Sequence, residues 1–142
     1  MPRGQLLPAG TEEAVFAGRN SLRALTRFQK CFGKQGSATI GYNRHSLGRL
    51  IGPGYFTVLA EDGGLLRFDY DTLPAAGLPG WPPVASNQGL FAGQVYGHLS
   101  DRVAWVSTDV LVGSAYRSGK DLDSYFVLAR TNPQAEEGRD QR

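Results

Sequence analysis

Apolar side chains recur at helical spacing near the start of the chain. These positions are Leu22, Leu25, Phe28 and Phe32, and Gly33 follows them as a natural C-cap. Basic residues fall on the opposite face, namely Arg19, Arg23, Arg27, Lys30 and Lys34. The pattern predicts an N-terminal amphipathic helix over residues 20–32, with Cys31 on its apolar side as a core residue rather than a nucleophile. Thr11 and the two glutamates after it predict an earlier helix start, which Gly18 weakens.

After this segment the hydrophobic period changes to two. "GYFTVLA" at 54–60 and "LLRFDY" at 65–70 read as strands, and the "EDGG" between them can supply the positive φ of a tight turn. The two strands are predicted to pair antiparallel. A further strand is predicted over residues 38–43.

Short strands follow one another closely in the second half of the chain. They are predicted over residues 90–99, 102–107, 109–117 and 123–131, with polar turns between them. This spacing is typical of an antiparallel meander, as in a sandwich or an up-and-down barrel, here with about seven strands. Leu111, Gly113 and Ala115 share one strand face, and their small size leaves room for a helix or a ligand. The predicted fold class is therefore mainly β with one N-terminal helix.

A proline-rich segment, residues 71–89, interrupts the strands. Proline lacks the donor that a sheet requires, so this segment is predicted to be a long covering loop. Burying Trp81 of this loop is worth about 2–3 kcal/mol, and the mouth of a barrel is its expected place. The remaining organisation is one domain over 11–130, a flexible N-terminus over 1–10 and a disordered tail over 131–142.

Composition narrows the function classes. The chain has 142 residues, a net charge of +2, one cysteine and two histidines, which argues against a disulfide or a structural metal, and no cofactor is predicted. No apolar run is long enough to span a bilayer and no secretory signal is evident, so the default location is cytoplasmic. Residues 14–60 carry seven basic and no acidic side chains, an asymmetry that can attract an anionic partner.

The stretch "GYNRHSLGRLIGPGYFTV", residues 41–58, has the glycines and arginines of a ligand loop. It lacks the lysine and the following helix of a phosphate loop, and it lacks the βα context of a dinucleotide fingerprint. Its Gly-Pro-Gly is better explained as a turn. A rim formed by Asn43, Arg44, His45 and Arg49 could bind an anion; the alternative is a solvated loop.

"VYGHLSDR", residues 95–102, places His98 and Asp101 close together. They are the candidate proton-transfer groups if their strand face looks into a cavity. The alternative is that Asp101 bonds a turn and His98 is simply exposed.

The order of a short helix, an antiparallel meander and a long covering loop resembles the lipocalin-like, or calycin-type, β-barrels. The resemblance covers the organisation of residues 20–130, and Gly41-Tyr42-Asn43 stands where lipocalins carry Gly-x-Trp. It implies a cup for a small, mostly apolar molecule. The predicted ligand-binding residues are Phe56, Val58, Phe68, Tyr70, Trp81, Tyr96, His98, Trp105, Tyr116 and Phe126.

Three functions follow from these observations. The first is binding of a small apolar or amphipathic molecule. The second is a small β-barrel enzyme of the isomerase or cyclase kind, with its proton-transfer group in the same cavity. The third is an interaction module that uses the basic helix face; a nucleic acid partner is not favoured, because the five charges have no interleaved aromatic side chain. The sequence leaves the oligomeric state open.

Overall fold

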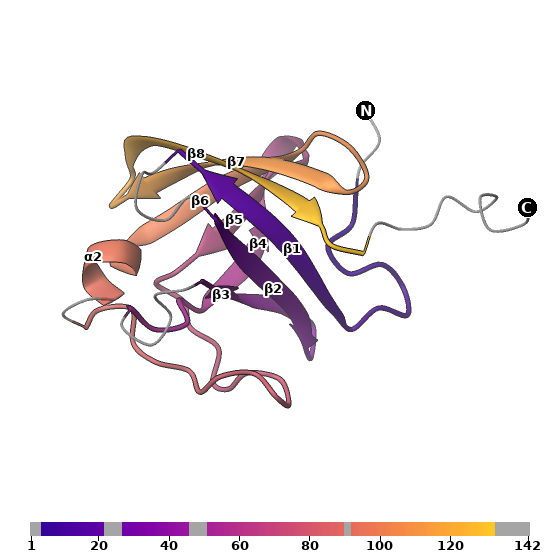
Figure 1. Cartoon of the computed structure of the whole chain (residues 1–142), viewed down its shortest axis with the longest axis horizontal. Helices are drawn as coiled ribbons and strands as arrows, with labels where there is room; N and C mark the ends of the chain where they lie inside the picture. The colour runs from indigo at the N-terminus through magenta and orange to yellow at the C-terminus, as the bar shows by residue number, and fades with distance from the viewer. Residues whose placement is uncertain (1–3, 22–26, 46–50, 90–91, 133–142) are drawn as a thin grey trace, which may run out of the picture.

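A computed structural model describes residues 4–21, 27–45, 51–89 and 92–132. These residues form a closed barrel of antiparallel strands in which each strand pairs with the next along the chain and β8 pairs with β1 (Figure 1). The eight strands are β1 (Glu13–Asn20), β2 (Arg27–Gln35), β3 (Ala38–Arg44), β4 (Phe56–Ala60), β5 (Leu66–Asp69), β6 (Leu99–Trp105), β7 (Val110–Arg117) and β8 (Lys120–Arg130). The architecture is mainly β, as the strand patterns of the second half indicate.

The predicted N-terminal amphipathic helix is wrong. Residues 13–20 and 27–35 are strands β1 and β2, joined in an antiparallel ladder from Glu13 opposite Gly33 to Arg19 opposite Arg27. Residues 22–26, which include Arg23, lie outside the described residues. The physical reason is pairing: without β1 and β2, the edges of β3 and β8 would leave their backbone groups unpaired. The basic helix face proposed as an interaction surface is therefore absent.

The strand predicted over residues 90–99 is partly wrong, whereas the hairpin predicted over residues 54–70 is confirmed. Residues 92–96, predicted to be part of a strand, form the short helix α2 (Ala92–Tyr96). The hairpin of β4 and β5 is confirmed, and its turn contains the 3-10 helix η1 (Asp62–Gly64), where both Gly63 and Gly64 have positive φ. No helix within the described ranges is long and apolar enough to cross a membrane.

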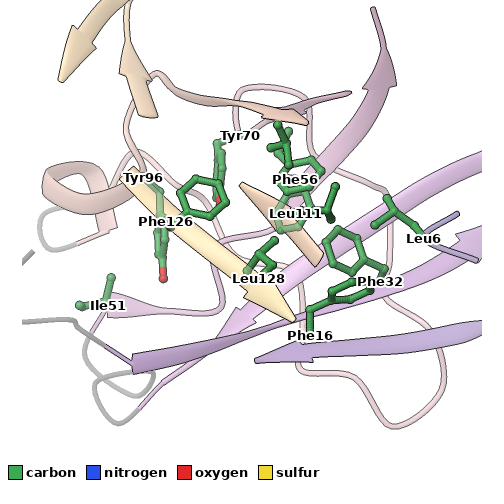
Figure 2. Packing of buried hydrophobic residues seen from close by; sticks show 12 residues of the cluster. Leu6, Phe16, Phe32, Ile51, Phe56, Tyr70, Tyr96, Leu111, Phe126 and Leu128 are labelled. Carbon is green, nitrogen blue, oxygen red and sulfur yellow. The ribbon is translucent and has the colours of Figure 1, made fainter. Parts of the chain in front are cut away.

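Aromatic and aliphatic side chains fill one end of the barrel. In Figure 2, Phe16, Phe32 and Leu6 lie away from α2, whereas Tyr70 and Tyr96 lie near it. Residues 4–10, predicted to be flexible, contribute Leu6 to this core, where it is buried. Arg130 of β8 donates hydrogen bonds to the carbonyls of Leu6 (3.1 Å) and Gln5 (2.5 Å). The N-terminal segment therefore closes this end, and residues 133–142 of the predicted tail lie outside the described residues.

The loop of residues 71–89 covers the outside of the barrel. Trp81 packs on Tyr42 and Tyr55, with ring centroids 4.8 and 6.2 Å away, and its indole Nε1 donates to Glu13 Oε1 at 2.8 Å. A Cβ on Gly33 of β2 would collide with Trp81 and Leu78, so glycine there admits the loop. Trp81 is thus on the outer wall, against Cys31 and its neighbours, and not at the mouth of the barrel.

Candidate functional site

A cavity of about 320 Å³ opens at the end of the barrel that carries α2. Most of its surface is apolar, and its most deeply buried side chains include several that carry polar groups. The lining residues are Asn20, Phe28, Lys30, Asn43, His45, Tyr70, Val95, Tyr96, Leu99, Asp101, Ala115, Arg117, Leu122, Ser124 and Phe126. They come from α2, from strands on all sides of the barrel and from the connections next to them, so closure of the barrel creates the site.

Strand alternation points Lys30 into the barrel. On β2, Phe28 and Phe32 share its inward face, so the lysine stands between two aromatic side chains. In the β2–β3 ladder Lys30 is directly opposite Asn43, which also faces inward. Lys30 is 3% exposed and Asp101 of β6 is 3% exposed, so both ionisable groups are removed from bulk water.

These side chains form one hydrogen-bonded cluster, which we call the polar cluster: Lys30, Asn43, Tyr70 and Asp101. Lys30 Nζ donates to Asn43 Oδ1 at 2.7 Å and to the Tyr70 hydroxyl at 2.6 Å, and it lies 3.6 Å from Asp101 Oδ2. The Tyr70 hydroxyl lies 3.4 Å from Asp101 Oδ2, to which it can donate. Asn43 Nδ2 donates to the Gly54 carbonyl at 3.0 Å, which fixes the orientation of the amide.

Burial shifts the titration of the polar cluster toward neutral forms. It lowers the pKa of Lys30 to about 8, although the nearby Asp101 carboxylate opposes the change. It raises the pKa of Asp101, against the opposing effects of Lys30 and Tyr70. The pKa of Tyr70 is well above its ordinary value, chiefly because of burial and then because of Asp101. Lys30 and Asp101 are therefore closer in proton affinity than an exposed lysine and aspartate, whereas Tyr70 stays protonated.

Aromatic rings surround the lysine amine. Nζ lies 4.9 Å from the ring centroid of Phe56 and 5.3 Å from that of Tyr70, and the rings of Phe28, Phe68 and Phe126 are within 5.7 Å. Such rings stabilise an ammonium ion by cation–π attraction and exclude water from it. Of these rings, Phe28, Tyr70 and Phe126 also line the cavity.

The α2 helix completes the site. Tyr96 stacks on Tyr70 with ring centroids 5.6 Å apart and an interplanar angle of 4°, and its hydroxyl lies 2.8 Å from His45 Nε2. Burial lowers the pKa of His45, with a further contribution from Lys30. Arg117 donates to the carbonyls of Gly97 (3.1 Å) and Val95 (3.2 Å), so it fixes the end of α2 beside the opening.

The structure brings together some of the predicted ligand-binding residues. Tyr70, Tyr96 and Phe126 line the cavity. The other predicted ligand-binding residues do not line it. Phe56, Val58 and Phe68 pack in or against the core, and Trp105 packs at the closed end. Tyr116 stacks with Arg102, and His98 and Trp81 lie on the outside of the barrel.

Some of the candidate proton-transfer and anion-binding residues line the cavity and others do not. Asp101 lies in the cavity, but the His98 side chain is 63% exposed and lies 3.5 Å from Asp71 instead. His45 lines the opening, Arg44 is exposed and donates to Gln29, and Arg49 lies outside the described residues. Arg44 and His45 both border a second groove next to the cavity. The predicted anion-binding rim stays a prediction.

Sequence reasoning missed Lys30, and it placed Asn43 in an anion-binding rim rather than beside Lys30. Lys30 was assigned to a solvated basic face because a helical period was applied to its segment. The signal that identifies it is the alternation Phe28, Lys30, Phe32, which in a strand places a lysine between two core aromatics. The place of Asn43 beside Lys30 follows only from the register of the β2–β3 ladder, in which the two residues are opposite each other.

Comparisons of the chain with protein-family models, with curated proteins and with solved structures find no significant match. The closed antiparallel eight-stranded barrel is consistent with a calycin-like architecture. The comparisons do not show that the chain is a lipocalin.

Proposed function

We propose that the protein binds a small, neutral, amphipathic molecule in the cavity beneath α2, with the polar end of the ligand against the polar cluster. The observation that carries the proposal is a cavity with apolar walls and a buried, hydrogen-bonded group of polar side chains at its inner end. Ligand sites in proteins have this composition, and about 320 Å³ is at the small end of their usual range of about 300–1,000 Å³.

Charge balance favours a neutral ligand. The polar cluster contains one basic and one acidic side chain, so it carries no net charge whether the pair is ionised or neutral. A carboxylate brought to Lys30 would also approach Asp101, and an uncompensated buried charge costs several kcal/mol. A ketone, an aldehyde or an alcohol can instead exchange hydrogen bonds with Lys30 and Tyr70 without adding charge.

The test compares three ligands of equal chain length, 1-octanol, 2-octanone and octanoate, by amide NMR titration of the full chain. We expect the two neutral compounds to shift the resonances of β2, β6 and α2. We expect octanoate to bind at least about tenfold more weakly, which corresponds to about 1.4 kcal/mol. Equal or tighter binding of octanoate would contradict the proposed neutral ligand, and no binding of any of the three would argue against an amphipathic ligand of this size.

A matched pair of variants locates the binding. Ala115 lines the cavity directly opposite Asp101 in the β6–β7 ladder, whereas its neighbour Ser114 lies in a shallow groove on the outside of the barrel. Ala115→Leu should fill the space beside the polar cluster and abolish octanol binding, and Ser114→Leu should leave it intact. Circular dichroism of both variants shows whether each is folded.

The second candidate is an isomerase that uses Asp101 for proton transfer in the same cavity. Its support is the position of this carboxyl group, buried beside Tyr70 with a raised pKa, which makes its carboxylate a stronger base than that of an exposed aspartate. The test is conversion of oct-4-en-2-one into its conjugated isomer, followed by ultraviolet absorption. Turnover that disappears in Asp101→Asn would support this candidate, and absence of turnover by the wild type would leave binding alone.

A further inference from the structure

We infer that Lys30 is a site of reversible covalent attachment, at which its Nζ condenses with the carbonyl group of an aldehyde or ketone ligand to form an imine. This inference rests on the proposed binding function and specifies its chemistry. It assigns to the buried lysine a role that hydrogen bonding alone does not require. A compact hydroxyl or amide would bind a neutral ligand without burying an ionisable amine.

The geometry gives the amine access to a bound carbonyl. Lys30 and Tyr70 both line the cavity, so a carbonyl group that hydrogen-bonds to Tyr70 lies next to Nζ, which is 2.6 Å from the same hydroxyl. The apolar chain of the ligand would then extend along Phe28 and Phe126 toward the opening. Desolvation by the surrounding rings increases the fraction of neutral amine, which is the nucleophilic form.

The neighbouring groups can carry the protons that the reaction moves. The Nζ lone pair attacks the carbonyl carbon, a C–N bond forms, and the π electrons move to the oxygen. One amine proton passes to that oxygen through the Tyr70 hydroxyl to give a carbinolamine. Asp101 in its acid form then protonates the hydroxyl group, which leaves as water while the C=N bond forms.

The other amine proton returns to Asp101, or stays on nitrogen as an iminium ion that its carboxylate balances. For the neutral imine, the released water carries one amine proton and the proton from Asp101, and the second amine proton restores the acid form of Asp101. Neither an oxidant nor a reductant is needed.

The chain offers a clean internal comparison because it contains only three lysines, Lys30, Lys34 and Lys120. Lys34 is on the same strand as Lys30, and both Lys34 and Lys120 are exposed to solvent. With a pKa of about 8, Lys30 is about one quarter neutral at about pH 7.5, whereas a lysine with the ordinary pKa of about 10.4 is neutral in about one molecule per thousand. Exposure alone would favour labelling of the other two lysines, so preference for Lys30 would report the site.

The experiment incubates the full chain with octanal and sodium cyanoborohydride, which reduces an imine to a stable secondary amine, and maps the octyl group by peptide mass spectrometry. We expect Lys30 to be labelled at least about tenfold faster than Lys34 or Lys120. An excess of 1-octanol should suppress the labelling of Lys30 and leave that of Lys34 unchanged. Ala115→Leu should have the same selective effect, and Ser114→Leu should have none.

The outcomes separate this inference from the proposed function. If 1-octanol and 2-octanone bind but Lys30 is not labelled in preference to the exposed lysines, imine formation is overturned and neutral-ligand binding stands. Preferential labelling of Lys30 that 1-octanol does not suppress would also overturn the inference, because the reaction would then occur without the proposed binding mode. If neither binding nor labelling occurs, both proposals fail.

Discussion

Lys30 of β2 and Asp101 of β6 approach each other inside the barrel, with Nζ 3.6 Å from Oδ2 and both side chains buried. Removing one member of such a pair leaves the other as an uncompensated buried group, which typically costs about 3–5 kcal/mol. Two strands that are not neighbours in the barrel are thereby linked by one interaction. The site and the stability of the fold therefore depend on the same side chains.

A double-mutant cycle measures this dependence. We expect Lys30→Met to lower the free energy of unfolding by about 3–5 kcal/mol, and Asp101→Asn to lower it also. The double variant should lose less than the sum of the single losses by about 1–3 kcal/mol, because it leaves neither charge unpaired. The measurement is urea unfolding at neutral pH. Lys34→Met on the same strand is the control, with an expected change within about 0.5 kcal/mol; additive losses at Lys30 and Asp101 would show that the pair is not coupled.

The pH dependence of imine formation should report the titration of Lys30. Burial lowers the pKa of this amine to about 8, so the rate of its labelling by octanal should fall about tenfold per pH unit below that value and level off above it. Among the groups that face it, Tyr70 has a raised pKa and stays neutral, and His45 has a lowered pKa and is neutral near pH 8. Asp101 also has a raised pKa, because of burial.

The measurement takes timed samples, quenches them with sodium borohydride and quantifies the labelled Lys30 peptide. N-acetyl-lysine methyl amide under the same conditions corrects for the pH dependence of the reagents. A rate that still rises tenfold per unit well above pH 8 would contradict a lowered pKa for this amine.

The β4–β5 hairpin could be predicted because its information is local. Alternating apolar residues flank two glycines, and these glycines adopt the positive φ that the turn requires. The strands of the second half have similar local signals. By contrast, β2 is buried on both faces: Phe28 and Phe32 point inward, and Cys31 lies under the loop that carries Trp81. A strand covered on both faces loses its period of two, and here the remaining apolar spacing resembles that of a helix.

The error at residues 90–99 has a different cause. Strand β5 ends at Asp69, and its partners on β6 begin at Ser100, so a strand extending before Leu99 would have had no ladder on that side. The chain instead forms α2, and His98 takes a φ of 52° where it turns into β6. The secondary-structure propensity of one segment cannot reveal where its partner strand stops.

Tyr96 and Asp101 could be named as site residues from the sequence. Lys30 could not, because a lysine in a basic run is usually solvated.

Arg130 is predicted to anchor the segment that closes the end of the barrel opposite α2. Its guanidinium is bonded to Asp109 Oδ1 at 2.8 Å and to the carbonyls of two residues before β1, and it lies over the ring of Phe16. Arg130→Met should release residues 4–7, increase their hydrogen exchange and lower the free energy of unfolding by about 3 kcal/mol. Arg67→Met is the matched control, because Arg67 is 42% exposed and pairs with Glu61 at the surface. Unchanged exchange in Arg130→Met would show that Leu6 alone holds the segment.

A substitution at Trp81 tests whether the loop of residues 71–89 only stabilises the fold or also controls access to the cavity. Because it packs on Tyr42 and Tyr55 outside the barrel and is not among the cavity residues, Trp81→Phe should weaken the attachment of the loop without affecting the ligand. We expect a loss of about 1–2 kcal/mol in the free energy of unfolding, from lost aromatic contact and from the lost hydrogen bond to Glu13. Affinity for 1-octanol, measured by calorimetry, should stay within about twofold of the wild type, which is about 0.4 kcal/mol. A large loss of affinity with unchanged stability would instead make this loop a lid, and the cavity would then have to open toward β2 and β3 rather than beneath α2.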